Sequence, residues 1–448
     1  MAGTWEHVGM GGNTVRAGFL SVLSAVVLAV AAMLNPGVGL AATGLIMGAT
    51  GTPEPSSGEM QKAMQYYLDP LTSCKVAVCS LTAVVTPEQL WPVPGWGDLT
   101  YDQSVAIGVD NLDAAIRAQL AADPTGPVVV FGSSQSAAIV ALEQHLLADQ
   151  PQSVKDRVTF VVTGDPNRPN GGLLARFYPL TVPSIGFTFN GPAPTDTGFT
   201  TYDIVFEYDA AGDFPRYPLN VFTIANILAG ALIHSSYLTY RDGYTDAELQ
   251  QAINDPANRQ TYGDTVYITI PTKELPLTQL IKTVGTALGA SSLTTPLADL
   301  LDPTLRVLVD LGYDRTTPYG QPAPVGLFNP IDPAKLAAEL VAAGQQGIQA
   351  ATADLRGNPH QPPTVPAAGN ATAAPGRAVA HSAASTIVPS TSTTAPSAGT
   401  TTPSSSTTVP STSTTGTHRN PTPPKATTKP SGARETGMGG PRRTATRP

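Results

Sequence analysis

The chain has 448 residues, a net charge of −8 and only two cysteines. The charge is uneven, because residues 357–448 carry eight Lys and Arg against one Glu, which leaves −15 on the remaining chain. An acidic body argues against nucleic acid as its ligand. The two cysteines have no histidine beside them and do not make up a zinc site, so we expect no metal and no cofactor.

Residues 1–42 have the order of a secretory signal. A polar segment ending in Arg16 precedes the uncharged apolar run 17–34, and small residues lead to Ala41 and Ala42. This order predicts export with cleavage near Ala41 or Ala42. The run is slightly long for a signal peptide, so an uncleaved membrane anchor at residues 17–34 also fits. In both cases we expect the body outside the cytoplasm, secreted or associated with the cell envelope.

Cys74 and Cys79 lie five residues apart in "SCKVAVCS". In an exported protein this spacing makes a local disulfide plausible, and two reduced, half-buried thiols are the alternative.

The last part of the chain, residues 357–448, consists mainly of Pro, Thr, Ser, Ala and Gly. It has too few large apolar residues to offset the entropy of ordering its backbone, which predicts a disordered tail. Ser/Thr-rich stretches with Pro are typical of O-glycosylated stalks or wall-spanning spacers. Its basic end can contact an anionic envelope, and a soluble spacer without a specific partner is the simpler alternative.

Between residues 43 and 356, apolar strand patterns alternate with helical ones. The expected strands cover residues 43–51, 75–85, 126–132, 157–165 and 201–209, and the expected helices cover residues 58–69, 101–123 and 136–149. This alternation predicts an α/β domain with a mostly parallel central sheet covered by helices on both faces. Functional sites of such sheets form at the carboxyl ends of the strands.

Apolar helical stretches broken by Gly and Pro are expected over residues 265–313. They suit a cover over an acyl-binding groove, and equally helices that pack against the domain and complete it.

The segment Gly132–Ser136, "GSSQS", is a variant of the nucleophile elbow G-x-S-x-G, with Ser136 in place of the last glycine. In such an elbow, a tight turn between a strand and a helix lifts the hydroxyl of the central serine, here Ser134, above the sheet. Small residues at Gly132 and Ser136 allow the strand and the helix to approach each other. An ordinary strand–turn–helix junction is the alternative.

Counting histidines identifies a base for this serine. One histidine precedes the apolar export segment and three lie in the tail: His7, His360, His381 and His418. His145 lies on the helix that follows the serine, about 16 Å along its axis, which is out of reach. His234, in "IHSSYLTY", remains and follows the serine in the order expected for a triad.

Three aspartates are candidates for the acid that orients the histidine. Asp209 ends the expected strand 201–209, and Asp213 lies in the loop beyond it with more freedom to reach across. We therefore rank Asp213 first and Asp209 second. Asp165 is third, because in "GDPNRPNGG" it also fits an Asx turn.

An oxyanion hole needs two donors directed at the developing negative charge. The backbone N–H of Gln135 is the expected first donor, since Gln135 follows the serine. The loop "IMGATGTPEPSS" offers the second, through the backbone of Gly51 or through Thr52 and its hydroxyl. A Gly/Pro turn without a catalytic role is the alternative for this loop.

Several of these segments together resemble one family. "LIMGATGTPEPS", "VVVFGSSQSAAIVALE", "GDPNRPNGG", "YDAAGDFPRYPLN" and "IHSSYLTY" are similar to the PE-PPE domain of mycobacterial exported proteins, over about residues 43–312. The resemblance implies a serine α/β-hydrolase related to cutinases, with Ser134, Asp213 and His234 as its triad. The elements "GSSQS", "GD" and "HSSY" carry this assignment and favour Asp213 over Asp209. An export segment stands where many relatives have a PE or PPE helical module, so the usual helical partners are not implied.

The sequence thus predicts an exported serine esterase or lipase that hydrolyses acyl esters or lipids through an acyl-enzyme. One alternative is an acyltransferase that passes the acyl group to an envelope glycolipid of the trehalose type. A second alternative is a non-catalytic protein associated with the cell wall.

Overall fold

In the computed structural model of the chain, the described residues are 42–93, 95–239 and 241–357. The predicted export segment at residues 17–34 and the predicted tail beyond residue 357, with its basic end, lie outside them.

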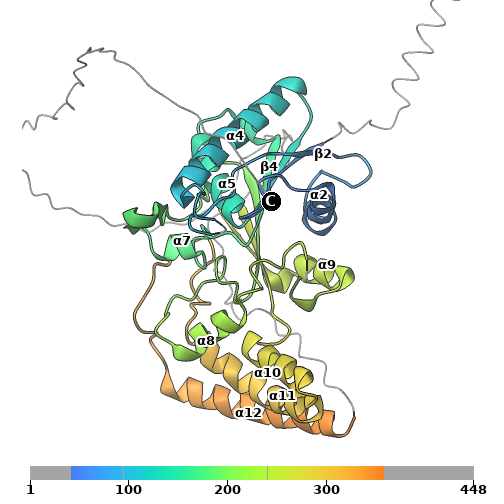
Figure 1. Cartoon of the computed structure of the whole chain (residues 1–448), viewed down its shortest axis with the longest axis vertical. Helices are drawn as coiled ribbons and strands as arrows, with labels where there is room; N and C mark the ends of the chain where they lie inside the picture. The colour runs from blue at the N-terminus through green and yellow to red at the C-terminus, as the bar shows by residue number, and fades with distance from the viewer. Residues whose placement is uncertain (1–41, 94, 240, 358–448) are drawn as a thin grey trace, which may run out of the picture. The chain divides into compact units, whose positions relative to one another are not determined.

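A seven-stranded sheet forms the centre of the fold (Figure 1). Its strands lie in the order β2–β1–β3–β4–β7–β9–β8, and every pairing is parallel except that of β8 with β9. Their bounds are β1 Thr43–Ile46, β2 Ser80–Ala83, β3 Val128–Ser133, β4 Val158–Thr163, β7 Thr200–Phe206, β8 Arg259–Tyr262 and β9 Thr265–Ile270. The α/β fold with a mostly parallel central sheet is therefore confirmed.

Helices cover both faces of the sheet because its central strands are apolar on both sides. In β3, Val129 and Phe131 pack in a core with Met64, whereas Val128 and Val130 pack in a second core with Ile139. Successive side chains of a strand point to opposite faces, so this one strand supplies both cores. In Figure 1, α4 and α5 lie on one side of the sheet, and α2 and α9 on the other. These helices are α2 Ser57–Ala63, α4 Tyr101–Ala122, α5 Gln135–Leu146 and α9 Asp246–Asn254.

The predicted strand 75–85 is much shorter in the structure. Cys74 and Cys79 form a disulfide, and the turn that it closes leaves Val76 and Val78 exposed. Pairing with β1 starts only at Ser80.

The segment after His234 contains a strand that its apolar pattern did not indicate. Residues Thr265–Ile270 form β9, which pairs with β7, so the expectation of helical stretches from residue 265 is wrong at its start. The β-branched residues of "TVYITI" favour this strand.

The helices that follow β9 pack against one another and against α8. Their bounds are α8 Val221–Ala229, α10 Pro276–Ala287, α11 Ser291–Asp310 and α12 Pro333–Leu355. Within the described part of the chain, none of the helices is long and apolar enough to cross a membrane. The remaining short elements are a π-helical turn at Met64–Leu68, α3 Asp69–Leu71, α6 Gln152–Lys155, α7 Leu173–Arg176, the hairpin strands β5 Thr181–Val182 and β6 Phe187–Thr188, and 3₁₀ turns at Pro183–Ile185, Arg241–Gly243 and Pro256–Asn258.

Candidate active site

The turn between β3 and α5 holds Ser134 in an unusual backbone conformation. Its φ is 59° and its ψ is −116°, a region that non-glycine residues rarely occupy. The turn is tight: a Cβ atom at Gly132 would lie 2.6 Å from the carbonyl oxygen of Ser136, so a larger residue would force the backbone apart. This is the strand–turn–helix context expected of a nucleophile elbow.

Ser136, which replaces the last glycine of the elbow pattern, connects two loops. Its Oγ accepts a hydrogen bond from the N–H of Ser133 at 2.7 Å and lies 2.5 Å from the carbonyl oxygen of Gly48, to which it donates. Gly48 belongs to the loop after β1. The serine hydroxyl therefore joins the elbow to the neighbouring loop at the carboxyl edge of the sheet, a link that glycine cannot make.

The structure brings Ser134 and His234 together from positions 100 residues apart. Nε2 of His234 lies 2.7 Å from Oγ of Ser134, and Nδ1 lies 2.8 Å from Oδ1 of Asp209. His234 lies in the turns that follow α8, whereas Asp209 follows the end of β7. The three side chains form one hydrogen-bonded chain from a hydroxyl through an imidazole to a carboxylate.

The contact with Asp209 corrects the preference for Asp213. Both oxygens of Asp213 bind the guanidinium of Arg315, at 2.6 and 2.8 Å, and Oδ2 also accepts the N–H of Tyr208 at 2.8 Å. The freedom assumed for Asp213 is absent, because its buried charge is compensated by Arg315. Asp165 accepts the N–H of Asn167 at 2.9 Å, the Asx turn considered as its alternative role.

The carboxylate of Asp209 is fully buried and has two further donors. Oδ1 accepts the N–H of Ala211 at 2.8 Å, and Oδ2 accepts the hydroxyl of Tyr237 at 2.5 Å. The Tyr237 oxygen in turn accepts the N–H of Phe206, the last residue of β7. No role was predicted for Tyr237 from the sequence, although it is the tyrosine of "HSSY", three residues after the histidine.

The charges of His234 and Asp209 shift each other's pKa. Burial alone lowers the pKa of His234, but the Asp209 charge and its hydrogen bond outweigh this effect and raise the pKa above its ordinary value. Burial alone raises the pKa of Asp209, but His234 and the donors around it bring the pKa below the ordinary value. The pair therefore favours a charged carboxylate that stabilises an imidazolium.

The predicted oxyanion donors differ in whether their backbone N–H groups already have a hydrogen-bond partner. Gln135 is the first residue of α5, where N–H groups have no partner inside the helix. The N–H of Thr52 donates to the carbonyl of Ala49, and that of Gly51 donates to the carbonyl of Glu88, so the Thr52 hydroxyl is the donor that Thr52 can offer.

The side chain of Gln135 has a structural role in addition to the oxyanion role predicted for its backbone. It is buried, accepts a hydrogen bond from the hydroxyl of Thr50 and donates to the carbonyl of Gln89 and the hydroxyl of Ser104. These contacts fix the start of α5 against the loops after β1 and β2 and against α4. A buried glutamine between two loops has no signature in a single sequence.

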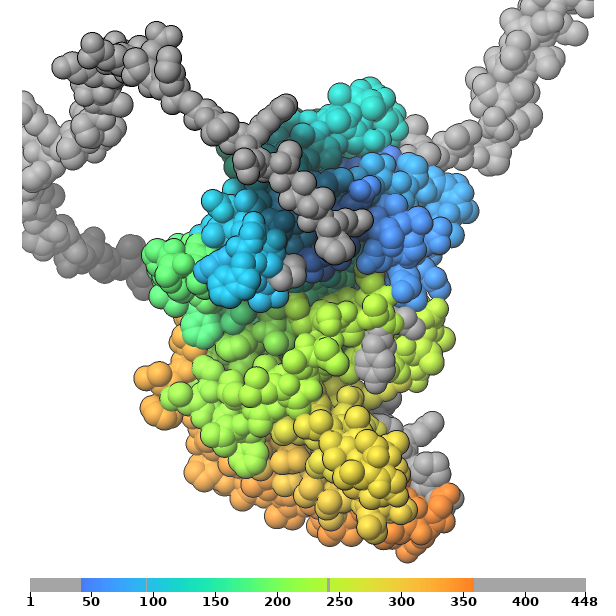
Figure 2. Space-filling view, viewed as in Figure 1, coloured from blue at the N-terminus to red at the C-terminus, as the bar shows by residue number. Residues whose placement is uncertain are grey.

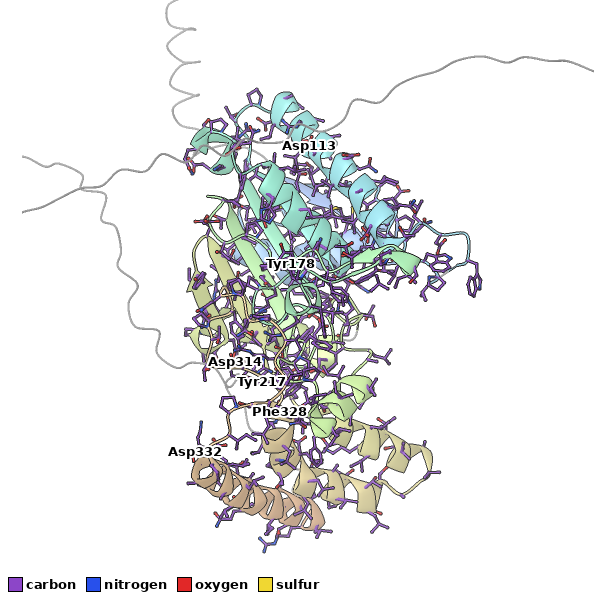
Figure 3. The ribbon with its side chains drawn as sticks, turned by 90° about the vertical axis from the view of Figure 1, so that its left-hand side faces the viewer. Asp113, Tyr178, Tyr217, Asp314, Phe328 and Asp332 are labelled. Carbon is purple, nitrogen blue, oxygen red and sulfur yellow. A yellow bond between two sulfur atoms is a disulfide. The ribbon has the colours of Figure 1, made fainter. Side chains whose placement is uncertain are left out.

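A pocket of about 860 Å³ lies at the junction of α11, α12 and residues 313–317. Figure 3 labels Tyr217, Asp314 and Asp332 of its wall. Neither Ser134 nor His234 lines this pocket. Its walls carry charges of both signs, many of them already paired, as in Arg216–Asp314 at 2.5 Å.

A serine hydroxyl bound to an imidazole whose other nitrogen faces a carboxylate is an arrangement that can activate the hydroxyl as a nucleophile. The imidazole can take the hydroxyl proton while the carboxylate stabilises the resulting positive charge. The start of α5 places helix N–H groups, and the positive end of the helix dipole, beside the hydroxyl.

Comparison with known proteins identifies relatives over much of the chain. The uncharacterized PPE family protein PPE42 of Mycobacterium tuberculosis is 40% identical over 337 residues, covering 74% of this chain and 54% of its own length. The esterase PE16 of the same organism is 39% identical over 305 residues, covering 67% of this chain and 54% of its own length. The SL1278 acyltransferase Chp1, also of M. tuberculosis, is 31% identical over 331 residues, covering 72% of this chain and 74% of its own length.

The chain thus spans about half the length of the first two relatives. The sequence pattern of the PE-PPE domain matches residues 79–314, which include Ser134, Asp209 and His234. This match covers more than half of the chain, and the chain belongs to the PE-PPE domain family.

Proposed function

We propose that the protein is a serine carboxylic ester hydrolase that acts on acyl esters through Ser134, His234 and Asp209. The observation that carries the proposal is the hydrogen-bonded chain of these three side chains, with distances of 2.7 and 2.8 Å. The strained conformation of Ser134 supports it, because such conformations cluster at functional sites.

In the proposed reaction, Oγ of Ser134 attacks the carbonyl carbon of the ester while Nε2 of His234 takes the hydroxyl proton. The tetrahedral intermediate collapses, and the leaving alcohol receives this proton, which leaves an acyl group on the serine. Water then attacks the acyl-enzyme with His234 again as base, and the carboxylic acid leaves as the serine recovers its proton. Asp209 holds the imidazole and stabilises its charged form throughout.

The intermediate carries a negative charge on the former carbonyl oxygen. We assign its stabilisation to the backbone N–H of Gln135 and to the hydroxyl of Thr52. The N–H of Gln135 is at the first position of α5, and the Gln135 side chain is held by Thr50, Gln89 and Ser104. Donors fixed in advance in this way stabilise the transition state without reorganising during the reaction.

The chain on either side of α8 favours an acyl chain or lipid as the substrate. Residues 217–239 contain no Asp, Glu, Lys or Arg, and they include His234. Apolar side chains of this segment are exposed: Leu219 (60%), Val221 (72%), Leu228 (71%) and Leu232 (80%). Figure 2 shows the surface of this part of the chain in lime, above the yellow helices of residues 276–310. We propose that the acyl chain lies against this surface while its ester bond meets Ser134.

Acyl transfer is the second candidate, because it requires only that a sugar hydroxyl replace water in the second half of the reaction. The relative Chp1, described as an acyltransferase, favours it. The acceptor in that case would be an envelope glycolipid of the trehalose type.

We further propose that residues 43–356 form the catalytic domain, that residues 1–42 direct its export, and that the tail from residue 357 extends from it at the cell envelope. Fractionation of the full chain into cytosol, envelope and medium tests this placement.

The reaction is tested with a fluorophosphonate probe and a p-nitrophenyl acyl ester. Labelling and ester turnover are expected in the wild type and absent in Ser134→Ala and His234→Ala. Unchanged turnover in Ser134→Ala would show that this serine is not the nucleophile. Absence of labelling in the folded wild type would favour a non-catalytic wall-associated protein. Addition of an acylated trehalose separates the two reactions, because acyl transfer yields acylated acceptor faster than free acid.

A further inference from the structure

Asp213 does not contact His234, but it forms hydrogen bonds with the backbone on both sides of Asp209, the residue that contacts His234. Its Oδ2 accepts the N–H of Tyr208 at 2.8 Å, and its own N–H donates to the carbonyl of Asp209 at 2.9 Å. Asp213 therefore holds the peptide before Tyr208 and the peptide after Asp209. The short turn that presents the Asp209 carboxylate is closed by this one residue.

The turn needs such support because its backbone is strained. Tyr208 has a φ of 65°, which is uncommon for a residue with a side chain. Strained conformations persist where surrounding contacts determine them fully. The hydroxyl of Tyr208 donates to Asp310 at 2.9 Å, so side-chain and backbone contacts both hold this residue.

Arg315 in turn fixes Asp213. The guanidinium binds both carboxylate oxygens, at 2.6 and 2.8 Å, and lies 4.2 Å from the centre of the Tyr313 ring. The side chains of Asp213 and Arg315 are 3% and 10% exposed. A buried bidentate pair of this kind fixes orientation as well as charge, and lysine cannot reproduce its two parallel contacts.

We propose that Asp213 and Arg315 are positioning residues that hold the Asp209 carboxylate at the imidazole of His234. The expected effect on rate rests on the proposed hydrolase function, whereas the positioning of Asp209 at His234 does not depend on it. Arg315 also lines the 860 Å³ pocket, so through Asp213 it connects the turn that carries Asp209 to the wall of that pocket.

The expected consequence concerns the titration of His234. The polar and charged groups around His234 and Asp209 are as follows. Ser134 and Asp209 contact the imidazole, and Tyr237 contacts Asp209. Asp213, which holds the turn, is surrounded by Arg315, Glu207, Arg176 and Asp310. If the turn loosens, Asp209 withdraws and no longer raises the pKa of His234. The imidazole then titrates at lower pH and is held less well for proton transfer.

The test uses the full chain with Arg315→Met, Arg315→Lys and, as a matched control, Arg216→Met. Arg216 lines the same pocket and forms an ion pair with Asp314, but it does not bind Asp213. Displacement of a catalytic group by about 1 Å can cost about 100-fold in rate. In Arg315→Met we therefore expect fluorophosphonate labelling to slow by about 10- to 100-fold, with the acid limb of its pH profile at lower pH. Arg315→Lys should restore part of the rate, and Arg216→Met should behave as the wild type.

The second readout is the pH titration of the His234 ring protons by NMR, assigned with His234→Ala, which needs no substrate. A lower pKa of His234 in Arg315→Met, with a wild-type value in Arg216→Met, supports the positioning role even if the wild type hydrolyses no ester. An unchanged titration and an unchanged labelling rate per folded molecule, with only a lower Tm, would overturn it. If Arg315→Met does not fold, Arg315→Lys and Asp213→Asn decide by the same titration, and wild-type values in both refute the proposal.

Discussion

Nδ1 of His234 lies 2.8 Å from Oδ1 of Asp209, and this contact joins the turn after β7 to the turns after α8. The carboxylate is buried, whereas the imidazole side chain is 25% exposed. The carboxylate that we propose as the acid is therefore shielded from water, while the imidazole that we propose as the base is partly open to solvent.

The raised pKa of His234 predicts the pH dependence of ester hydrolysis. In the proposed reaction His234 accepts the Ser134 proton only when its imidazole is neutral, so activity should be lost as the pH falls through the pKa of His234. Because Asp209 raises this pKa above 6.5, we expect the acid limb of kcat/KM to have its midpoint above pH 6.5. Initial rates with a p-nitrophenyl ester between pH 5 and 9 measure it. A limb centred well below pH 6.5 would contradict the contact with Asp209.

Asp209→Asn removes the charge that stabilises the imidazolium. We expect kcat to fall by about 10³- to 10⁴-fold, as expected when a triad acid loses its charge. The acid limb should move to lower pH at the same time, since the pKa of His234 is no longer raised.

Asp165→Asn is the matched control for this variant. Burial and the nearby charge of Asp203 raise the pKa of Asp165 above its ordinary value, which favours the neutral carboxyl that asparagine resembles closely. Its oxygen can still accept the N–H of Asn167. We expect kcat within a few-fold of the wild type, and a loss as large as that of Asp209→Asn would show that the acid has been assigned wrongly.

Ser136→Gly restores the glycine of the usual elbow but removes the link from the elbow to Gly48. The loop after β1 carries Thr52, so its loosening should affect the transition state more than substrate binding. We expect kcat to fall by about tenfold with little change in KM. Ser136→Ala, which keeps the size of the side chain without its hydrogen bonds, should show the same loss. Wild-type kcat in both variants would exclude this role for the hydroxyl.

Leu228→Asp and Leu232→Asp place charges on the exposed apolar surface around α8. Both side chains are largely exposed, at 71% and 80%, so the fold should tolerate the change. We expect hydrolysis of long-chain esters to fall by about tenfold or more, while hydrolysis of a two-carbon ester changes little. Leu146→Asp, at the end of α5 and 62% exposed, is the control. Equal losses for short and long esters would argue against acyl binding at this surface.

The sequence by itself determined the elements that depend on local pattern. The valines of β3, the helical period of α4 and the small residues around Ser134 indicate a strand, a helix and a tight turn wherever they occur. Elimination also left His234 as the candidate base, because the other histidines lie outside the α/β body or too far along α5.

Only the tertiary structure decided which aspartate faces that histidine. Asp209 and Asp213 are four residues apart in one loop, and local pattern favours the freer one. The choice depends on Arg315, a residue 102 positions after Asp213, whose buried guanidinium binds Asp213 and leaves Asp209 to His234. Residues distant in sequence set this contact, because a buried charge must find its partner wherever the fold brings one.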